Sequence, residues 1–480
     1  MALAKCGAIS ESLQVSASLP QLTVFSWTAI ISAYADCGLG HEALSMHQHM
    51  LDSGIEPDKY TFVSLFEACG CIHDLERGKR LHTDAREKGF TVDVFSCNTL
   101  VSMYGKCGAI FEAEEVFCGM SCHTRISWNA MLSAYVDSGF AEHALLLFRQ
   151  IQTEGRSPNE PTFVLAIQAC SSLVERELTI LAKGEPVESV SLQIGRAIHV
   201  DAQRMGYTSD ISVGSALVSM YGKYGSIPEA ESAFSNLSDA NVVSWTAVIS
   251  TYVNLGQGVR GLQLFTQMHR IGTAPNQLTF IFALQALGVL MEDFSRQEQS
   301  VSIEVPRFIV HALHEDSDSQ GYTSDPCVGN LFVSMYGKCG AVFEAETIYQ
   351  GLLTRDVVAS NAMLFVYIGQ GEIEKASQLI KQMQIEHASL DEVSIIYMLQ
   401  LSREVGSVGI CYTGHFYIVS AGQVFTPIIS ATLIHAYGTC GSSVDAEMVL
   451  EEGCLLDERP ILHGLDGHSM MLQPLVGIIL

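Results

Sequence analysis

The stretch LVSMYGKCGAI at residues 100–110 returns as LVSMYGKYGSI at 217–227 and as FVSMYGKCGAV at 332–342. Three near-copies in one chain are compatible with three active sites, three metal sites or three copies of one building block. In a repeat protein, each repeat packs against its neighbours and keeps the residues that this packing requires. The segments between the copies decide which of these applies.

A second recurring segment has the pattern of a helix pair. FSWTAIISAYADCGLGHEALSMHQHM at 25–50 is matched at 126–151, at 243–268 and, more weakly, at 358–383. In one copy, Trp128, Leu132 and Tyr135 are spaced as on one face of a helix. A turn with glycine and a second amphipathic segment follow. The sequence therefore predicts a helix–turn–helix repeat of about 35 residues, which cannot bury both of its faces alone.

A third type of repeat carries TFVSLFEACG at 61–70, TFVLAIQACS at 162–171 and TFIFALQALG at 279–288. A proline precedes each copy, and Asp58, Asn159 and Asn276 lie where they can cap the helix that follows. The three types, which we name SW, TF and MYGKCG repeats, recur in one order. We therefore expect a stack of helix pairs over residues 23–450.

The two ends of the chain and two internal segments depart from this pattern. MALAKCGAISES at the start matches the second half of a MYGKCG repeat, so we expect residues 1–22 to be a partial N-terminal repeat of an incomplete chain. Residues 451–480 lose the pattern and are expected to be a degenerate C-terminal tail. Polar insertions near 173–191 and 291–304 lengthen two repeats, and insertions at the turns of a repeat protein are expected to be loops.

The composition limits the classes of function. Of the 480 residues, 52 are acidic and 26 basic, and this net charge of −26 argues against general affinity for polyanions, because phosphate contacts need Lys and Arg. The 14 cysteines form no CxxC motif, and several recur at one repeat position (Cys107, Cys339 and Cys440), so we interpret them as reduced, structural thiols. We find no apolar stretch long enough to span a bilayer and expect no membrane association.

The order of the repeats resembles the pentatricopeptide repeat family, in its PLS-type subclass of alternating plant-like long, short and standard motifs. SWTAIISAY, TFVSLFEAC, GKRLH and NTLVSMYGKCGAIFEAEEVF carry the resemblance, whereas the W-x₂-LG-x₂-Y signature of tetratricopeptide repeats is absent. The resemblance implies an all-α fold, a right-handed superhelical α-solenoid of helix–turn–helix repeats. It also implies a protein that binds single-stranded RNA in a mitochondrion or chloroplast.

The resemblance further implies which residues face the RNA. The family reads one base per repeat in the concave groove, with a polar residue early in the first helix and the last residue of the repeat. In the MYGKCG repeats these pairs are Asn98 with Thr124, Ser215 with Asn241, and Asn330 with Asp356. Weaker candidates in the SW repeats are Thr28 with Asp58, Asn129 with Asn159, Thr246 with Asn276, and Asn361 with Asp391. The family's code would make Asn330 and Asp356 prefer uridine, and Ser215 and Asn241 prefer adenine.

Several of these residues also have a purely structural interpretation. Asp58, Asn159 and Asn276 would be needed as helix caps in a protein that never meets RNA. The lysine of each MYGKCG motif ends a helix, where a cation favours the helix dipole, and a phosphate contact is the alternative (Lys106, Lys223 and Lys338). We interpret the recurring His82, His199 and His311 as packing residues rather than metal ligands, and Trp27, Trp128 and Trp245 as core.

Catalytic motifs are not recognised. The deaminase domain of editing members needs an H-x-E and a downstream C-x-x-C to hold zinc, and EEGCLLDERPILHGLDGHSMM at 451–471 has neither, so we recognise no DYW deaminase domain. We expect no enzyme, no cofactor and no metal. The leading hypothesis is a monomeric, sequence-selective RNA-binding adaptor for organellar editing, splicing, processing or stability, which could act with protein partners.

Two alternatives stay open. One is a helical scaffold that binds a protein along the same groove. The other is a truncated or degenerate product, which the start within a repeat and the apolar Ala431 at one base-reading position would fit.

Overall fold

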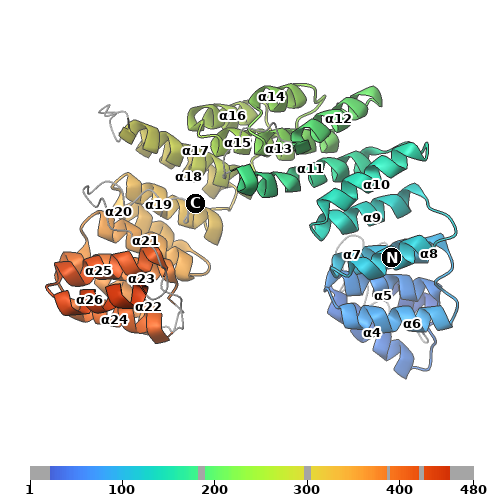
Figure 1. Cartoon of the computed structure of the whole chain (residues 1–480), viewed down its shortest axis with the longest axis horizontal. Helices are drawn as coiled ribbons and strands as arrows, with labels where there is room; N and C mark the ends of the chain where they lie inside the picture. The colour runs from blue at the N-terminus through green and yellow to red at the C-terminus, as the bar shows by residue number, and fades with distance from the viewer. Residues whose placement is uncertain (1–21, 182–189, 297–303, 386–389, 421–425, 455–480) are drawn as a thin grey trace. The chain divides into compact units, whose positions relative to one another are not determined.

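The computed structural model of the chain describes residues 22–181, 190–296, 304–385, 390–420 and 426–454. Within these ranges every regular element is an α-helix, so the predicted all-α fold of helix pairs is confirmed (Figure 1). The chain divides into two compact halves, Met1–Thr251 and Tyr252–Leu480. We call the first helix of each pair the A helix and the second the B helix.

In the first half, the helices are α3 (Val24–Asp36), α4 (Gly40–Asp52), α5 (Lys59–Cys71), α6 (Leu75–Glu87), α7 (Val94–Lys106), α8 (Ile110–Gly119), α9 (Arg125–Asp137), α10 (Ala141–Thr153), α11 (Glu160–Leu181), α12 (Val190–Arg204), α13 (Ile211–Lys223) and α14 (Ile227–Ser235). The boundary between the halves falls within α15 (Val242–Asn254). Odd-numbered helices are A helices and even-numbered helices are B helices.

In the second half, the helices are α16 (Gly258–Arg270), α17 (Gln277–Arg296), α18 (Glu304–Ser319), α19 (Pro326–Lys338), α20 (Val342–Gly351), α21 (Val357–Gly369), α22 (Ile373–Ile385), α23 (Glu392–Val405), α24 (Val408–Ser420), α25 (Pro427–Thr439) and α26 (Ser443–Cys454). Consecutive A helices pack on one another in each half, such as α5 on α7 and α19 on α21. B helices fill the space between successive A helices, as α8 does between α7 and α9.

The MYGKCG motif ends an A helix and turns the chain into its B helix. Gly108 has φ 70°, in the left-handed region that favours glycine, and its N–H donates a hydrogen bond to the carbonyl of Gly105. A Cβ added to Gly105 would lie 2.5 Å from the Cβ of Ala134 on α9, so these A helices touch through a glycine. The equivalent contacts are Gly222 with Thr251 and Gly337 with Val366. Packing therefore explains why the motif is nearly identical in its three copies.

The recurring histidines are packing residues, as predicted, with one correction. Nδ1 of His82 lies 2.8 Å from the hydroxyl of Tyr104. In the next copy, Nδ1 of His199 lies 2.8 Å from the hydroxyl of Tyr221. In the second half the equivalent residue is His314, 3.0 Å from the hydroxyl of Tyr336, and not the predicted His311. The nearby insertion obscures this alignment in the sequence. His311 lies one helical turn earlier and also reaches that hydroxyl, at 3.1 Å.

The tryptophans belong to the core, as predicted. Trp27, Trp128 and Trp245 are all buried. Trp128 stacks edge-on against Phe117 at 5.1 Å between ring centroids, and Trp245 against Phe234 at 4.8 Å. These rings join an A helix to the B helix before it, so they are not available to stack on a ligand.

The two insertions are partly helical, which differs from the predicted loops. α11 continues to Leu181 and α17 to Arg296, and their B helices begin at Val190 and Glu304. The remainder of each insertion, residues 182–189 and 297–303, lies outside the described ranges. The predicted N-terminal partial repeat and most of the C-terminal tail also fall outside them, at 1–21 and 455–480.

One helix is longer and more apolar than the sequence analysis expected. Residues Gln277–Phe294 of α17 are long and apolar enough to cross a membrane by length and composition. However, α17 packs against α16, α18 and α19 and fully buries Phe280, Leu284 and Leu287. A core helix of a repeat stack has these properties, so the match to a membrane span is weak evidence.

Candidate nucleic-acid interface

All seven residues predicted at repeat ends are N-caps of A helices. In each, a side-chain oxygen accepts a hydrogen bond from the backbone N–H three residues further on (Asp58, Thr124, Asn159, Asn241, Asn276, Asp356 and Asp391). The expected structural role of Asp58, Asn159 and Asn276 is therefore confirmed. A cap uses one oxygen of the side chain, so the second polar atom of an Asp or Asn side chain can still form a hydrogen bond with a ligand.

In two of the four SW repeats, the early polar residue is an asparagine that is bonded to its predicted partner. Nδ2 of Asn129 on α9 donates to Oδ1 of Asn159 at 3.0 Å, and the hydroxyl of Thr162 donates to Oδ1 of Asn129 at 2.7 Å. The equivalent bonds in the second half are Asn361 Nδ2 to Asp391 Oδ1 at 2.9 Å and the Ser394 hydroxyl to Asn361 Oδ1 at 2.7 Å. Both ends of these two amides are thus used between neighbouring A helices.

The two threonines at the same position are also bonded within the protein. The hydroxyl of Thr28 on α3 lies 2.7 Å from the hydroxyl of Thr61 on α5. Thr246 on α15 donates to the carbonyl of Val242 in its own helix, at 2.7 Å. The early residues of all four weaker pairs therefore make internal hydrogen bonds.

The MYGKCG repeats differ at this same position. The side-chain oxygen here is buried and has no hydrogen-bond partner in the described part of the chain. This holds for Oδ1 of Asn98 on α7, Oγ of Ser215 on α13 and Oδ1 of Asn330 on α19. Their predicted partners, Thr124, Asn241 and Asp356, are exposed and bond to the backbone of their own helices instead. A buried polar oxygen without a partner costs about 1–3 kcal/mol, so its recurrence at one repeat position needs an explanation.

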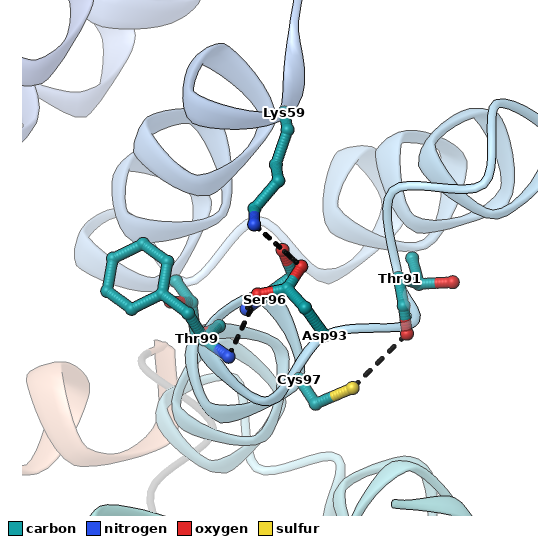
Figure 2. A network of polar contacts seen from close by, with 7 residues as sticks. Lys59, Thr91, Asp93, Ser96, Cys97 and Thr99 are labelled. Atoms are coloured by element: carbon teal, nitrogen blue, oxygen red, sulfur yellow. Dashed lines mark hydrogen bonds and ion pairs between the residues drawn. The ribbon is translucent and has the colours of Figure 1, made fainter.

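The N-terminal turn of α7, which carries Asn98, is held by residues that the sequence analysis missed. Asp93 caps α7 by accepting a hydrogen bond from the N–H of Ser96, and Nζ of Lys59 on α5 lies 3.1 Å from its Oδ2 (Figure 2). Burial alone would raise the pKa of Asp93, but the hydrogen bonds from Ser96 and Lys59 hold this pKa below its usual value. The ion pair fixes α5 against α7 beside the candidate residue.

A similar contact recurs in the second half, and the sequence contains a signal for it. Nε2 of Gln277, the first residue of α17, donates to Oδ1 of Asp325, the cap of α19, at 2.8 Å. An aspartate stands directly before each of the three MYGKCG helices, namely Asp93, Asp210 and Asp325. An N-cap at a fixed distance before each copy of the motif could have been predicted.

Exposed apolar side chains form a second feature that the sequence analysis missed. They occupy the second position of successive A helices: Phe25 is 80% exposed, Tyr60 59%, Phe95 55% and Ile126 67%. Each lies three residues before the early position, as Phe95 does before Asn98, and residues i and i+3 are neighbours on a helix surface. In the second half, Leu278 and Val358 occupy the same position and are exposed. The signal was an apolar residue recurring outside the buried stripe.

The lysines of the MYGKCG motifs are not equivalent in the structure. Lys106 and Lys223 are exposed at the last residues of α7 and α13, with no ion-pair partner among the described residues. Nζ of Lys338, in contrast, lies 4.0 Å from the carboxylate of Glu292, and burial lowers the pKa of this amine. Lys106 and Lys223 can therefore meet a phosphate, whereas Lys338 has a structural contact.

One basic side chain on each of the B helices α6, α12 and α18 is neutralised by an ion pair. A cation of each TF repeat pairs with a glutamate on the B helix of the following repeat: Lys79 with Glu112 at 2.6 Å, Arg196 with Glu229 at 2.8 Å, and Arg307 with Glu344 at 2.6 Å. These cations are therefore neutralised by carboxylates of the protein itself. Arg80 and Arg86 on α6 are exposed like Lys106 and Lys223, and none of these four has an ion-pair partner among the described residues.

Comparison with known sequences bears on this repeated pattern. The PPR repeat family model matches residues 22–71, and the PPR repeat model matches residues 95–123, 126–156, 243–273 and 358–386. Five segments of the chain therefore match pentatricopeptide repeats. The matched segments are the SW repeats and one MYGKCG repeat, together with the start of the first TF repeat.

Similar proteins carry the same repeats. The chain is 28% identical over 415 residues to the pentatricopeptide repeat-containing protein At4g18520, chloroplastic, of Arabidopsis thaliana, covering 85% of this chain and 62% of that protein. It is 32% identical over 282 residues to the Arabidopsis thaliana protein At2g33680, covering 59% of this chain and 37% of that one. The chain thus spans less than two thirds of the length of these pentatricopeptide repeat-containing relatives.

Solved structures with similarity include the maize pentatricopeptide repeat protein PPR10. Its crystal structure aligns with a TM-score of 0.41 and 16% identity, covering 99% of this chain and 80% of that one. PPR10 in complex with an 18-nt psaJ RNA element aligns with a TM-score of 0.38 and 15% identity, covering 99% of this chain and 86% of that one.

Proposed function

We propose that the chain is a sequence-selective adaptor that binds single-stranded RNA along its A helices, as a PLS-type pentatricopeptide repeat protein that is not an enzyme. The MYGKCG repeats read bases, and the SW and TF repeats hold the stack in register. Asn98, Ser215 and Asn330 are the primary contacts to base edges. Thr124, Asn241 and Asp356 supply the second contact in each pair.

The observation that carries this proposal is the set of unpartnered oxygens at one repeat position. Oδ1 of Asn98, Oγ of Ser215 and Oδ1 of Asn330 each lack a donor among the described residues. The imino and amino groups of a splayed base are donors, and single-stranded RNA presents them on exposed Watson–Crick edges. Base binding would remove the cost of the buried, unpaired oxygen, which gives a physical reason for its repeated occurrence.

The exposed apolar row supports the same site. Phe25, Tyr60 and Phe95 are exposed on successive A helices, three residues before the early positions. Bases stack on aromatic side chains in single-stranded complexes, with about 1–3 kcal/mol per base. Stacking on this row would place each base edge next to the early position on the same helix face.

The electrostatics limit the affinity rather than the specificity. The chain has a net charge of −26, and many cations are bound in ion pairs with glutamates. Long-range attraction of RNA is therefore weak, and binding depends on the few exposed lysines and on stacking. We expect moderate affinity with a shallow salt dependence, because few lysines contact phosphate.

The compartment and the biological step are part of the proposal. Relatives such as At4g18520 are named chloroplastic, and the family resemblance adds mitochondria, so we propose an organelle. The adaptor would act as a monomer in editing, splicing, processing or stability of a transcript. Protein partners of that process would supply any chemistry.

A binding experiment with two matched variants tests the proposal. The protein is mixed with a randomised pool of single-stranded RNA at several salt concentrations, and the bound fraction is sequenced. Asn330→Ala should weaken a uridine preference at one position, because it removes an oxygen that has no hydrogen-bond partner among the described residues. Asn361→Ala, one repeat later, should leave the base preferences unchanged, because that amide is already bonded to Asp391.

Two outcomes would overturn the proposal. One is the absence of RNA binding even at low salt while the protein remains helical. The other is equal loss of base preference in both variants. The alternative function, a scaffold for a protein partner, is favoured by the acidic composition, and it would be supported by a stable protein complex that free RNA does not compete away.

A further inference from the structure

Two thiols face each other near the end of the described chain. Sγ of Cys411 on α24 lies 3.7 Å from Sγ of Cys440, the C-cap residue of α25. Cys411 is buried, and Cys440 is partly exposed. Ser402 borders both thiols: its Oγ lies 3.0 Å from Cys411 Sγ, and its carbonyl oxygen lies 3.3 Å from Cys440 Sγ. The two sulfurs are thus already in contact while the thiols are free.

The register of the repeats shows that this pair is a departure from the common pattern. Cys440 occupies the position of Cys107 and Cys339, each the C-cap of its A helix. The position of Cys411, however, is glycine in two earlier repeats, Gly78 and Gly195. Cys440 therefore stands at a position where cysteine recurs in the repeats. Cys411 stands at a position that holds no cysteine in the earlier repeats.

A compensating change makes room for the added side chain. A Cβ on Gly78 would lie 2.6 Å from Sδ of Met103, and a Cβ on Gly195 would lie 2.6 Å from Sδ of Met220. In the repeat that carries Cys411, the residue at the methionine position is Ala436. Replacing methionine by alanine frees the volume that a cysteine side chain needs at the glycine position.

We propose that Cys411 and Cys440 are a dithiol site that closes to an intramolecular disulfide when it meets a disulfide oxidant such as oxidised glutathione. The bond would join α24 to the end of α25. The inference is independent of RNA binding, because it rests on the two sulfurs and on the local packing alone.

The reaction balances as two thiol–disulfide exchanges. The Cys440 thiol loses its proton to water, and its thiolate attacks one sulfur of oxidised glutathione, which breaks the S–S bond and releases one glutathione thiolate. The Cys411 thiol then loses its proton, and its thiolate attacks Sγ of Cys440, releasing the second glutathione. Two protein thiols and one oxidised glutathione become one protein disulfide and two reduced glutathiones.

The exposure of the two thiols sets this order. Cys440 is the accessible thiol, whereas burial raises the pKa of Cys411 to about 11 and makes it a poor first nucleophile. A disulfide has an S–S length of about 2.05 Å, so the sulfurs must approach further. Cys440 lies at the end of α25 and is followed by Gly441 with φ 84°, which lets the chain turn directly after the thiol.

The test is oxidation of the full chain, mapped by mass spectrometry. Dilute protein is treated with oxidised glutathione, quenched with an alkylating reagent and digested without reductant. The wild type should yield a linked pair of peptides containing Cys411 and Cys440. Cys411→Ser should instead stop with glutathione attached to Cys440, because the resolving thiol is gone. Cys440→Ser should yield neither product.

Cys339→Ser is the matched control, because Cys339 occupies the same repeat position and has Val310 where Cys411 stands. This variant should form the Cys411–Cys440 bond like the wild type. The proposal is overturned if the wild type retains glutathione on Cys440 as Cys411→Ser does, or if both thiols remain alkylated after treatment. The wild-type map decides the question even if a variant fails to fold.

Discussion

Nδ2 of Asn129 donates a hydrogen bond to Oδ1 of Asn159 at 3.0 Å, whereas Oδ1 of Asn98, at the same position one repeat earlier, has no partner in the described chain. The same residue type is therefore internally satisfied in one repeat and open in the next. This difference predicts opposite effects of the same substitution.

Asn129→Ala should destabilise the free protein, and Asn98→Ala should not. The first substitution removes two hydrogen bonds at 3.0 and 2.7 Å and should lower the free energy of unfolding by about 1–3 kcal/mol. The second removes a buried oxygen that has no partner and should leave the free energy of unfolding unchanged or raise it. Urea unfolding followed by circular dichroism measures both. Equal destabilisation by the two substitutions would contradict the finding that Oδ1 of Asn98 has no hydrogen-bond partner among the described residues.

Gly105→Ala should be one of the more damaging single-methyl additions in the chain. The new Cβ would lie 2.5 Å from the Cβ of Ala134, and neither helix backbone can move without disturbing its other contacts. We expect a loss of about 1–3 kcal/mol, although alanine has the better helix propensity. Gly119→Ala is the control, because nothing lies within 4 Å of its added Cβ. Thermal unfolding of both variants should show shifts of opposite sign or a clear shift for Gly105→Ala alone.

The protein should lose stability on mild acidification. Burial lowers the pKa of His82, His199 and His314, so the folded protein binds these protons less readily than the unfolded chain, in which a histidine has a pKa of about 6.5. As the pH falls below about 6.5, the unfolded chain gains protons first, and the free energy of unfolding decreases until the folded-state pKa values are passed. Melting temperatures measured between neutral and acidic pH would show this slope.

Replacing the buried rings separates this effect from general acid denaturation. His82→Asn combined with His199→Asn removes two titrating groups and should flatten the dependence of melting temperature on pH. His41→Asn, at an exposed position of α4, should leave it as steep as in the wild type. An unchanged slope in the double variant would exclude the His–Tyr pairs as the cause.

The salt dependence of RNA binding should identify the phosphate contacts. Lys106→Ala and Lys223→Ala should each weaken binding to all RNA sequences alike and lower the slope of log affinity against log salt by about 0.7. Lys79→Ala removes a cation that is paired with Glu112, so the slope should not change. Equal slopes for all four proteins would show that the lysines of the A helices do not meet phosphate.

The helix pairs and their caps were predictable from the sequence because they depend on local spacing. Trp128, Leu132 and Tyr135 follow the helical period, and Asn159 follows a proline and precedes a new apolar run. Helical period and capping act within one repeat, so a single sequence contains them. The continuation of α11 to Leu181 was missed because a polar insertion was assumed to be a loop.

The state of the candidate residues could not be predicted, because it depends on contacts between repeats. Asn98 and Asn129 have the same type and the same position in their helices. They differ because Asn129 bonds to Asn159, the cap of the next A helix, and to Thr162 on that helix, whereas Oδ1 of Asn98 has no hydrogen-bond partner among the described residues. The exposed Phe95 was likewise missed, since a periodicity analysis searches for buried stripes.

The hydrogen bond between Asn129 and Asn159 has a consequence for how such a protein would change its target. A repeat whose early asparagine is hydrogen-bonded to the next repeat does not bind a base through that amide (a silent repeat). A repeat without that hydrogen bond can bind a base (a responsive repeat). Loss of the Thr162 hydroxyl, which donates to Oδ1 of Asn129, would leave that oxygen without its donor, as Oδ1 of Asn98 is among the described residues. Discrimination between RNA sequences would then depend on a few widely separated nucleotides of a transcript. The nucleotides between them could change without affecting binding.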